Sequence, residues 1–271
     1  MKHIYYIFFT LIIILIFSLY FLTKKEPIQD NIIFLDQNEI SRFLTEDSDK
    51  YISNLSKADL FARKVSSSEE YKNIIKKCGV NLTTEEKTKL IKCCERADNF
   101  LKQHKYHHFS CEPISRLKWK IACTQNYKEH EYEDGFPHTR NDVIFLSRRN
   151  INKFIAISEN DDNLTNTLVH EKIHVYQKQY PREMKELLNR LGYTKCDIQV
   201  ENKRANPDID DIIYYDPVSK ECMYFSYTSN TPKNISDVKQ SNHITEHPYE
   251  KMAYEIAKSF IDTNIKKYKY I

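Results

Sequence analysis

Two histidines four residues apart, with a glutamate directly after the first, stand out in the stretch TNTLVHEKIHVYQK, residues 165–178. At about 100° per residue, an α-helix places His170 and His174 within about 40° of each other on one stripe. Two imidazoles on one stripe can bind the same ion, and Zn²⁺ readily accepts histidine nitrogens. Glu171 lies one residue's rotation away, where it can contact a metal-bound water rather than the metal. The HExxH pattern therefore predicts a Zn²⁺ site with a general base beside it.

The residues around this pattern predict a helix that is buried on two sides. One apolar flank contains Leu168 and Val175. The other contains Val169 and Ile173, with the polar histidine stripe between the two flanks. Lys172 projects opposite the histidines, so we expect it on a solvent-exposed back face. The alternative interpretation is a pair of core histidines whose nitrogens are satisfied by hydrogen bonds.

The segment TLVHEKIHVYQ resembles the active-site helix of zincin metallopeptidases, and the resemblance covers residues 110–265 in its order of strand, strand, HExxH helix and second helix. Metzincins carry a glycine three residues and a histidine six residues after the second motif histidine, where this chain has Gln177 and Tyr180. The chain is more similar to the gluzincin branch, in which a later helix supplies a glutamate. In HPYEKMAYEIA, Glu250 is followed by Ala253, as in the E-x-x-A pattern. Members with E-x-x-A-D have an acid where this chain has Tyr254, so that carboxylate is missing.

The resemblance implies a zinc-dependent peptidase that acts on a peptide or protein substrate. Zn²⁺ would be held by His170, His174 and Glu250, with water in the fourth position. Glu171 would take the proton of that water. Zincins bind the substrate main chain along an edge strand before the active-site helix, and residues 142–147 are the matching segment. The AT-biased composition and apolar N-terminus also resemble those of uncharacterised proteins of large DNA viruses.

Two other functions are open at this point. One is a non-catalytic membrane protein that keeps a zincin-like fold with a structural zinc. The other is a metal-independent interaction domain in which the motif is a coincidence. Glu171 argues against a structural zinc, because such a site needs no base beside the metal.

Several other residues are weaker candidates. His138 shortly precedes the expected edge strand, where it can donate to an oxyanion, bind substrate, or be an ordinary turn histidine. Three aspartates in the segment NPDID can hold Ca²⁺ or form a solvated turn. Three tyrosines can stabilise a tetrahedral intermediate or belong to the core of a hairpin. These six residues are Asp208, Asp210, Asp211, Tyr214, Tyr224 and Tyr227.

The chain is expected to divide into a membrane anchor and one polar part. The run IYYIFFTLIIILIFSLYFL has no charge and is just long enough to span a bilayer, and no small-x-small cleavage site follows it. We expect an N-terminal flank (1–3), a transmembrane anchor (4–22), a tether (23–36), a helical subdomain (37–104) and a zincin-like metallopeptidase domain (105–271). This organisation predicts a single-pass membrane protein that contacts the lipid bilayer through residues 4–22. Lysines on both flanks leave the side of the membrane open.

The expected fold class is α+β and zincin-like. The HExxH helix would pack against a small sheet whose strands come from RLKWKIACT and DVIFLS. An N-terminal helical segment and a single transmembrane helix would complete it. Within the helical segment, Thr83 stands three residues before Glu86, which predicts a capping box at a helix start.

The composition excludes several functional classes. The net charge is +3 with 41 basic and 38 acidic residues and no long basic block, so we expect no nucleic-acid partner. Only three glycines occur, and neither GxGxxG nor GxxxxGK[ST] is present, so nucleotide binding has no support. Seven cysteines without a CxxC pair argue against a zinc ribbon. They can form disulfides in an oxidising compartment or serve as small buried hydrophobic residues.

Overall fold

In the computed structural model, the main sheet is built around two parallel strands, β5 (Trp119–Thr124) and β7 (Val143–Ser147). Strand β6 (His138–Arg140) pairs antiparallel with the other side of β7, while β1 (Ile32–Phe34) and β2 (Gly79–Val80) pair with β5. All of β7 is buried, as expected for a parallel strand that is covered on both faces. The two predicted strands are therefore neighbours at the centre of the sheet.

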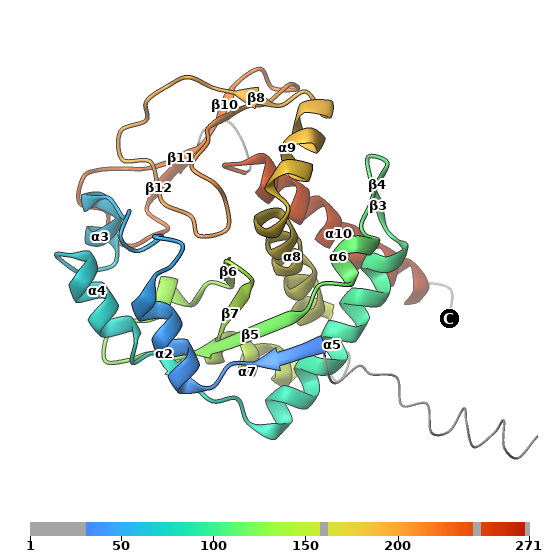
Figure 1. Ribbon diagram of the computed structural model, residues 1–271, viewed down its shortest axis with the longest axis horizontal. Coiled ribbons are helices and arrows are strands. Elements are labelled where there is room, and N and C mark those ends of the chain that lie inside the picture. The colour runs from blue at the N-terminus through green and yellow to red at the C-terminus, as the bar shows by residue number, and fades with distance from the viewer. Residues whose placement is uncertain (1–30, 158–161, 241–244, 269–271) are drawn as a thin grey trace, which may run out of the picture. The chain divides into compact units, whose positions relative to one another are not determined.

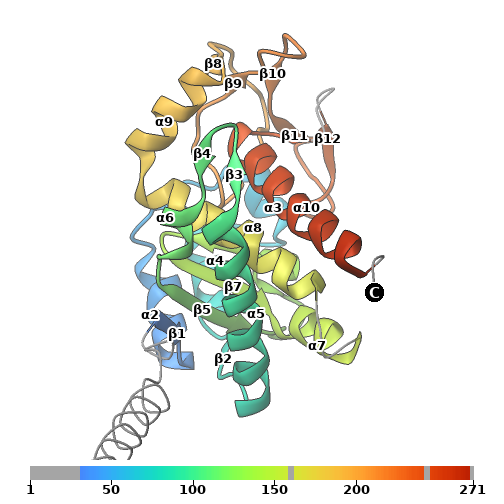
Figure 2. The same ribbon diagram turned by 90° about the vertical axis from the view of Figure 1, so that its right-hand side faces the viewer.

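The described residues, which are 31–157, 162–240 and 245–268, form nine α-helices. These helices are α2 (Gln37–Glu46), α3 (Lys57–Ala62), α4 (Ser68–Ile75), α5 (Thr84–Gln103), α6 (Glu112–Ser115), α7 (Arg148–Ile157), α8 (Asp162–Gln179), α9 (Pro181–Arg190) and α10 (Pro248–Tyr268). Helix α8 contacts β6 and β7 of the sheet and also packs against α5 and α10 (Figures 1 and 2). It is therefore enclosed by three different parts of the chain.

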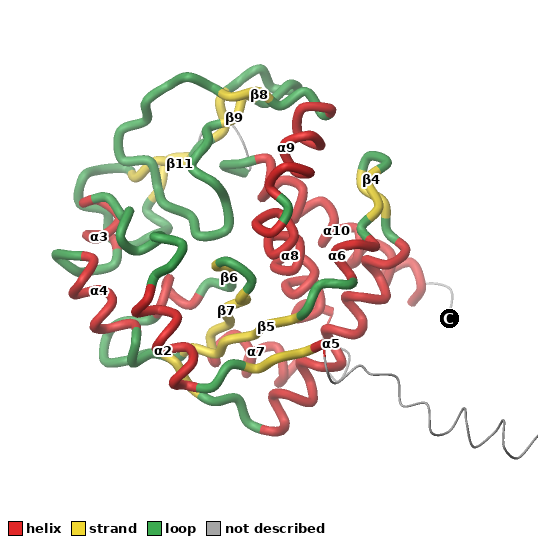
Figure 3. Tube along the Cα trace, in the orientation of Figure 1, coloured by secondary structure: helices red, strands yellow, loops and turns green. Residues whose placement is uncertain are grey.

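The remaining elements are short. They are the 3₁₀-helix η2 (Tyr132–Gly135) and the strands β3 (Lys105–Tyr106), β4 (Phe109–Ser110), β8 (Thr194–Lys195), β9 (Tyr214–Tyr215), β10 (Cys222–Met223), β11 (Phe225–Tyr227) and β12 (Val238–Gln240). The chain between α9 and α10 is mostly loop (Figure 3). A disulfide between Cys196 and Cys222 closes part of this loop, and the other five cysteines are free and buried. Two cysteines therefore form a disulfide, as one interpretation expected. The other five are small buried residues, as the other interpretation expected.

The fold-class prediction is corrected by this architecture. The described part of the chain is a mixed α/β structure with several small sheets, and none of its helices is long and apolar enough to cross a membrane. Its two longest helices, α5 and α10, carry charged side chains along their length. The predicted transmembrane helix and single-pass membrane localisation therefore find no support in the structure. The predicted anchor, residues 4–22, lies outside the described residues.

The predicted start of the long helix α5 is confirmed. Glu86 N–H donates to the Thr83 hydroxyl (3.2 Å), and Thr83 N–H donates to the Glu86 carboxylate (2.6 Å). This capping box satisfies two amides at a helix end that has no intrahelical partners for them. Contacts group Ile33–Ile271 into one compact unit. Within that unit, α5 of the predicted helical subdomain packs directly on α8.

The expectation for Lys172 is wrong, because the back face of α8 is covered by α5 and α6. Lys172 is only 1% exposed. Its ammonium pairs with Asp98 of α5, donates to the carbonyl of Ser115 (3.2 Å) and lies 4.1 Å from the centre of the Trp119 ring. Helix α8 is therefore buried on its back face as well, and an ion pair fixes it against α5.

A second buried ion cluster fixes the strand that follows η2. The Arg140 side chain is fully buried and donates to Asp47 (2.7 Å) and to the Tyr132 hydroxyl (3.0 Å). Its Nε atom donates to Asp49 (2.9 Å). The Asp47 side chain is 1% exposed and pairs with this arginine and with Lys72 (3.2 Å).

We expect Arg140→Leu to destabilise the protein by about 3–5 kcal/mol, because it breaks the buried ion pairs of this arginine with Asp47 and Asp49. The free energy of unfolding in urea measures the effect. The matched control is Arg182→Leu, since the Arg182 side chain is 84% exposed and its loss should change stability by less than about 0.5 kcal/mol. Equal stabilities for the two variants would contradict this assignment.

Candidate metal centre

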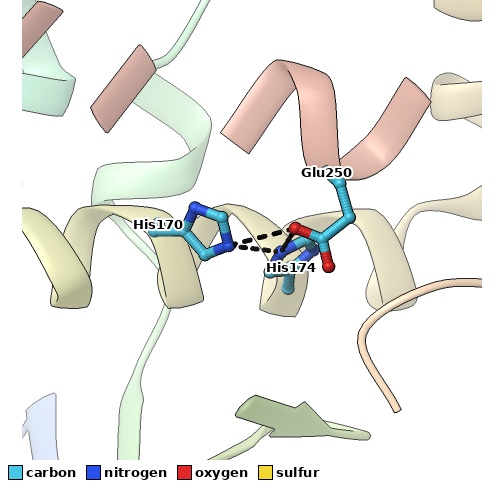
Figure 4. Close-up of side chains that lie close together, drawn as sticks. All are labelled: His170, His174 and Glu250. Atoms are coloured by element: carbon cyan, nitrogen blue, oxygen red, sulfur yellow. Dashed lines mark hydrogen bonds and ion pairs between the residues drawn. The ribbon is translucent and has the colours of Figure 1, made fainter. Parts of the chain in front are cut away.

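Two histidines of α8 and one glutamate of α10 converge at the packing interface of these helices (Figure 4). The Nε2 atoms of His170 and His174 are 3.0 Å apart. An Oε2 atom of Glu250 lies 3.4 Å from His170 Nε2 and 3.7 Å from His174 Nε2. Separations of this size suit one ion bonded at about 2.0–2.2 Å to each of three atoms in tetrahedral geometry. The three residues therefore form a triad that can bind a metal ion.

The protonation states within the triad also suit metal binding. His174 Nδ1 donates to the Gln177 side-chain oxygen (2.7 Å), so its Nε2 carries a free lone pair toward the other two ligands. Burial lowers the pKa of His174, which keeps the ring neutral. The site thus presents two imidazoles and a carboxylate, and His174 is neutral.

The structure brings Glu250 to the histidines and directs the neighbouring glutamates elsewhere. Glu246 pairs with Arg204 and accepts a hydrogen bond from the Asn206 side chain (2.8 Å). Glu255 accepts a hydrogen bond from the Tyr106 hydroxyl (2.8 Å). The E-x-x-A resemblance pointed to Glu250, and of these three glutamates Glu250 is the one that lies with the two histidines.

Three residues outside the triad position its ligands. Gln177 lies one turn after His174 and donates to the carbonyl of Tyr249, which connects α8 to the start of α10. Asn206 donates to the Glu250 carboxylate (2.8 Å) from the loop before β9. The Tyr254 ring contacts His170 edge to face with 4.6 Å between ring centres. A tyrosine thus contacts a metal-site histidine at the position where E-x-x-A-D sequences have an acid.

We expect Asn206→Ala to weaken metal binding by roughly 10–100-fold, because it removes a hydrogen bond that orients a ligand. Competition with a chelator of known affinity measures the change. Asn189→Ala, at an exposed position of α9, is the matched control and should bind metal like the wild type. The expectation fails if the Asn206 variant also keeps wild-type affinity.

Glu171 is buried beside the triad and is held by the neighbouring edge strand. The Thr139 hydroxyl donates to its carboxylate (2.9 Å) from β6. Burial, followed by the nearby carboxylate of Asp208, raises the pKa of Glu171 well above its usual range. A bound divalent cation would oppose this shift, because it favours the charged form of a nearby carboxylate. The arrangement places a fixed proton acceptor next to a metal site.

A pocket of about 510 Å³ opens beside these groups. His170, Glu171 and Glu250 line it, together with Tyr254 of α10 and Phe136 before β6. Such a volume is in the range of pockets that bind small molecules or parts of peptides. The triad is therefore accessible to a ligand.

His138 lines the same pocket, and its hydrogen bonding excludes one of the roles that the sequence left open for it. Its Nδ1 atom donates to the Phe136 carbonyl (2.9 Å), so Nε2 is an acceptor. Burial lowers the pKa of His138 to about 4, which keeps the ring neutral near pH 7. A neutral ring with this tautomer cannot donate to an oxyanion, whereas it can accept a hydrogen bond from substrate.

The expected edge strand is also corrected. Residues 142–147 contain β7, which pairs with β5 on one side and β6 on the other, so its backbone is not free to bind a peptide. The edge next to α8 is β6. At that edge, Thr139 N–H donates to Asp208 (2.5 Å). The sequence predicted β5 and β7 but not the short strand β6, which covers the side of β7 that was expected to be free.

The remaining candidates do not assemble into a calcium site or an oxyanion site. The three aspartates diverge: Asp208 contacts Thr139, Asp210 pairs with His247 (3.2 Å) and Asp211 is exposed. Tyr214 donates to Asp210 and Tyr227 to Asp59, and neither tyrosine lines the pocket beside the triad, nor does Tyr224. Within the described ranges, the triad is the one group of three or more His, Cys, Asp or Glu side chains whose ligand atoms lie close enough together to hold one metal ion.

Comparisons with protein-family models, curated proteins and solved structures gave no match for this chain.

Proposed function

We propose that the protein is a zinc-dependent metallopeptidase of gluzincin type. The proposal rests on the HExxH resemblance together with the geometry around α8. Two histidines and one glutamate would supply three protein ligands, a set that leaves a fourth position open in catalytic zinc sites. A zinc ion bound there would lower the pKa of a coordinated water and polarise the carbonyl of a peptide bond.

The observation that carries the proposal is the position of Glu171. Its carboxylate is 3% exposed, lines the pocket beside the triad and is fixed by the Thr139 hydroxyl. A carboxylate held in this way can accept the proton of an attacking water and later deliver it to the leaving amine. A purely structural metal site has no need of such a group.

Cleavage of a complex peptide mixture by the zinc-loaded protein tests the proposal. New peptide ends, identified by mass spectrometry, should appear with zinc and disappear when a chelator removes it. Zinc bound at one ion per chain without any new peptide ends would favour a structural zinc instead. Absence of bound zinc would favour a coincidental motif.

A further inference from the structure

The pocket beside the triad contains an unusual concentration of unsatisfied polar atoms. Among the described residues, three buried side-chain nitrogen or oxygen atoms lack a hydrogen-bond partner: His138 Nε2, Asn166 Oδ1 and Arg204 Nε. All three belong to residues that line this pocket. Buried polar atoms in folded proteins are nearly always paired, so their concentration at one place indicates a ligand that completes them.

The best defined of these atoms is an acceptor. His138 is 3% exposed, and its Nδ1 proton is already donated to the Phe136 carbonyl. Its Nε2 atom therefore needs a hydrogen-bond donor from the pocket, which a ligand can supply. This observation is independent of the charges in the pocket.

The charges favour a positive ligand. Two charged groups of the lining have partners within the protein, since Glu133 pairs with Arg63 (2.5 Å) and Arg204 pairs with Glu246. The two charges of a zinc ion would be matched by Glu250 and Glu171. One further carboxylate that lines the pocket then has no positive charge to balance it.

That carboxylate is Asp208, which is 7% exposed. One of its oxygens accepts the Thr139 amide, and within the described ranges it forms no ion pair. Burial, followed by the Glu250 carboxylate, raises the pKa of Asp208 well above its usual range. Lys178, whose ammonium donates to the carbonyl of Pro207 (2.6 Å), opposes this shift only in part. A buried carboxylate without a contact cation is costly, and a ligand that supplies the cation removes this cost.

We infer that Asp208 and His138 form a subsite for a positively charged substrate group, an ammonium or a guanidinium, next to the proposed metal site. Both residues are placed by β6: His138 lies in the strand, and Asp208 binds the amide of the next residue. A cation with several N–H donors can satisfy the carboxylate and the imidazole together. This inference rests on the proposed peptidase function and adds a substrate class to it. The group can be the free amino end of a peptide or a basic side chain.

Four small probes test the subsite in the zinc-loaded full chain without requiring turnover. They are lysine hydroxamate, norleucine hydroxamate and the N-acetyl derivatives of both, whose hydroxamate groups bind zinc. We expect the probes that carry the recognised positive group, on the side chain or at the amino end, to bind at least about tenfold more tightly than uncharged N-acetylnorleucine hydroxamate in calorimetry, as for a charge-assisted hydrogen bond. If the preference for the lysine probe remains after its amino end is acetylated, the subsite binds the basic side chain. If acetylation abolishes the preference, the subsite binds the amino end.

Asp208→Asn should remove this preference while leaving the affinity of the uncharged probe unchanged, because an amide can still accept the Thr139 hydrogen bond. Asp211→Asn, at an exposed position of the same loop, should keep the wild-type preference. Equal affinity of all four probes for the wild type, or an undiminished preference in Asp208→Asn, overturns the subsite alone. A protein that binds none of the probes overturns the proposed zinc site and the subsite together.

Discussion

Glu171→Gln is expected to lower the rate of peptide cleavage by roughly 10²–10⁴-fold or more while the protein keeps its zinc. The amide has the same shape and can still accept the hydrogen bond from Thr139, but it cannot accept a proton from water. Cleavage of a fluorogenic peptide and metal analysis of the same sample measure the two properties. Glu186→Gln changes an exposed glutamate of α9 and is the control. Unchanged turnover in the Glu171 variant would contradict the role of this residue as the general base.

Glu250→Ala is expected to lose most of the bound metal in a folded protein. The substitution removes one of three ligands, so the affinity should fall by more than the roughly 10–100-fold expected from losing an orienting neighbour. Glu255→Ala is the matched control on the same helix, because Glu255 binds the Tyr106 hydroxyl instead. Circular dichroism shows whether the fold is kept. If Glu250→Ala retains full zinc occupancy, a different carboxylate must complete the site.

The candidate site was predictable from sequence where the determining pattern is local. Four-residue spacing on one helix is enough to bring His170 and His174 together, and the E-x-x-A pattern of the last helix pointed to Glu250. The start of α5 followed from Thr83 and Glu86 for the same reason, since both belong to a single helix turn.

Contacts between distant segments could not be predicted in this way. Lys172 was expected in solvent because nothing near it in sequence shows that Asp98 and Trp119 cover that face of α8. Asn206 comes from a loop whose sequence carries no metal-site signal. The edge of the sheet was missed for another reason: β6 is only three residues long and was not predicted as a strand, so β7, which pairs with it across residues 141–142, was taken for the edge. The fold was therefore harder to predict from the sequence than the triad.

Titration of the metal-free protein with zinc, followed by peptide cleavage at each step, tests the central claim most directly. The site described here predicts that cleavage is absent without metal, rises in proportion to added zinc and stops rising at one zinc ion per chain. The same titration of His174→Ala should produce no cleavage. Cleavage that is indifferent to metal removal, or one bound zinc per chain without cleavage of any peptide, would contradict the claim that this triad and Glu171 form the catalytic centre of a zinc peptidase.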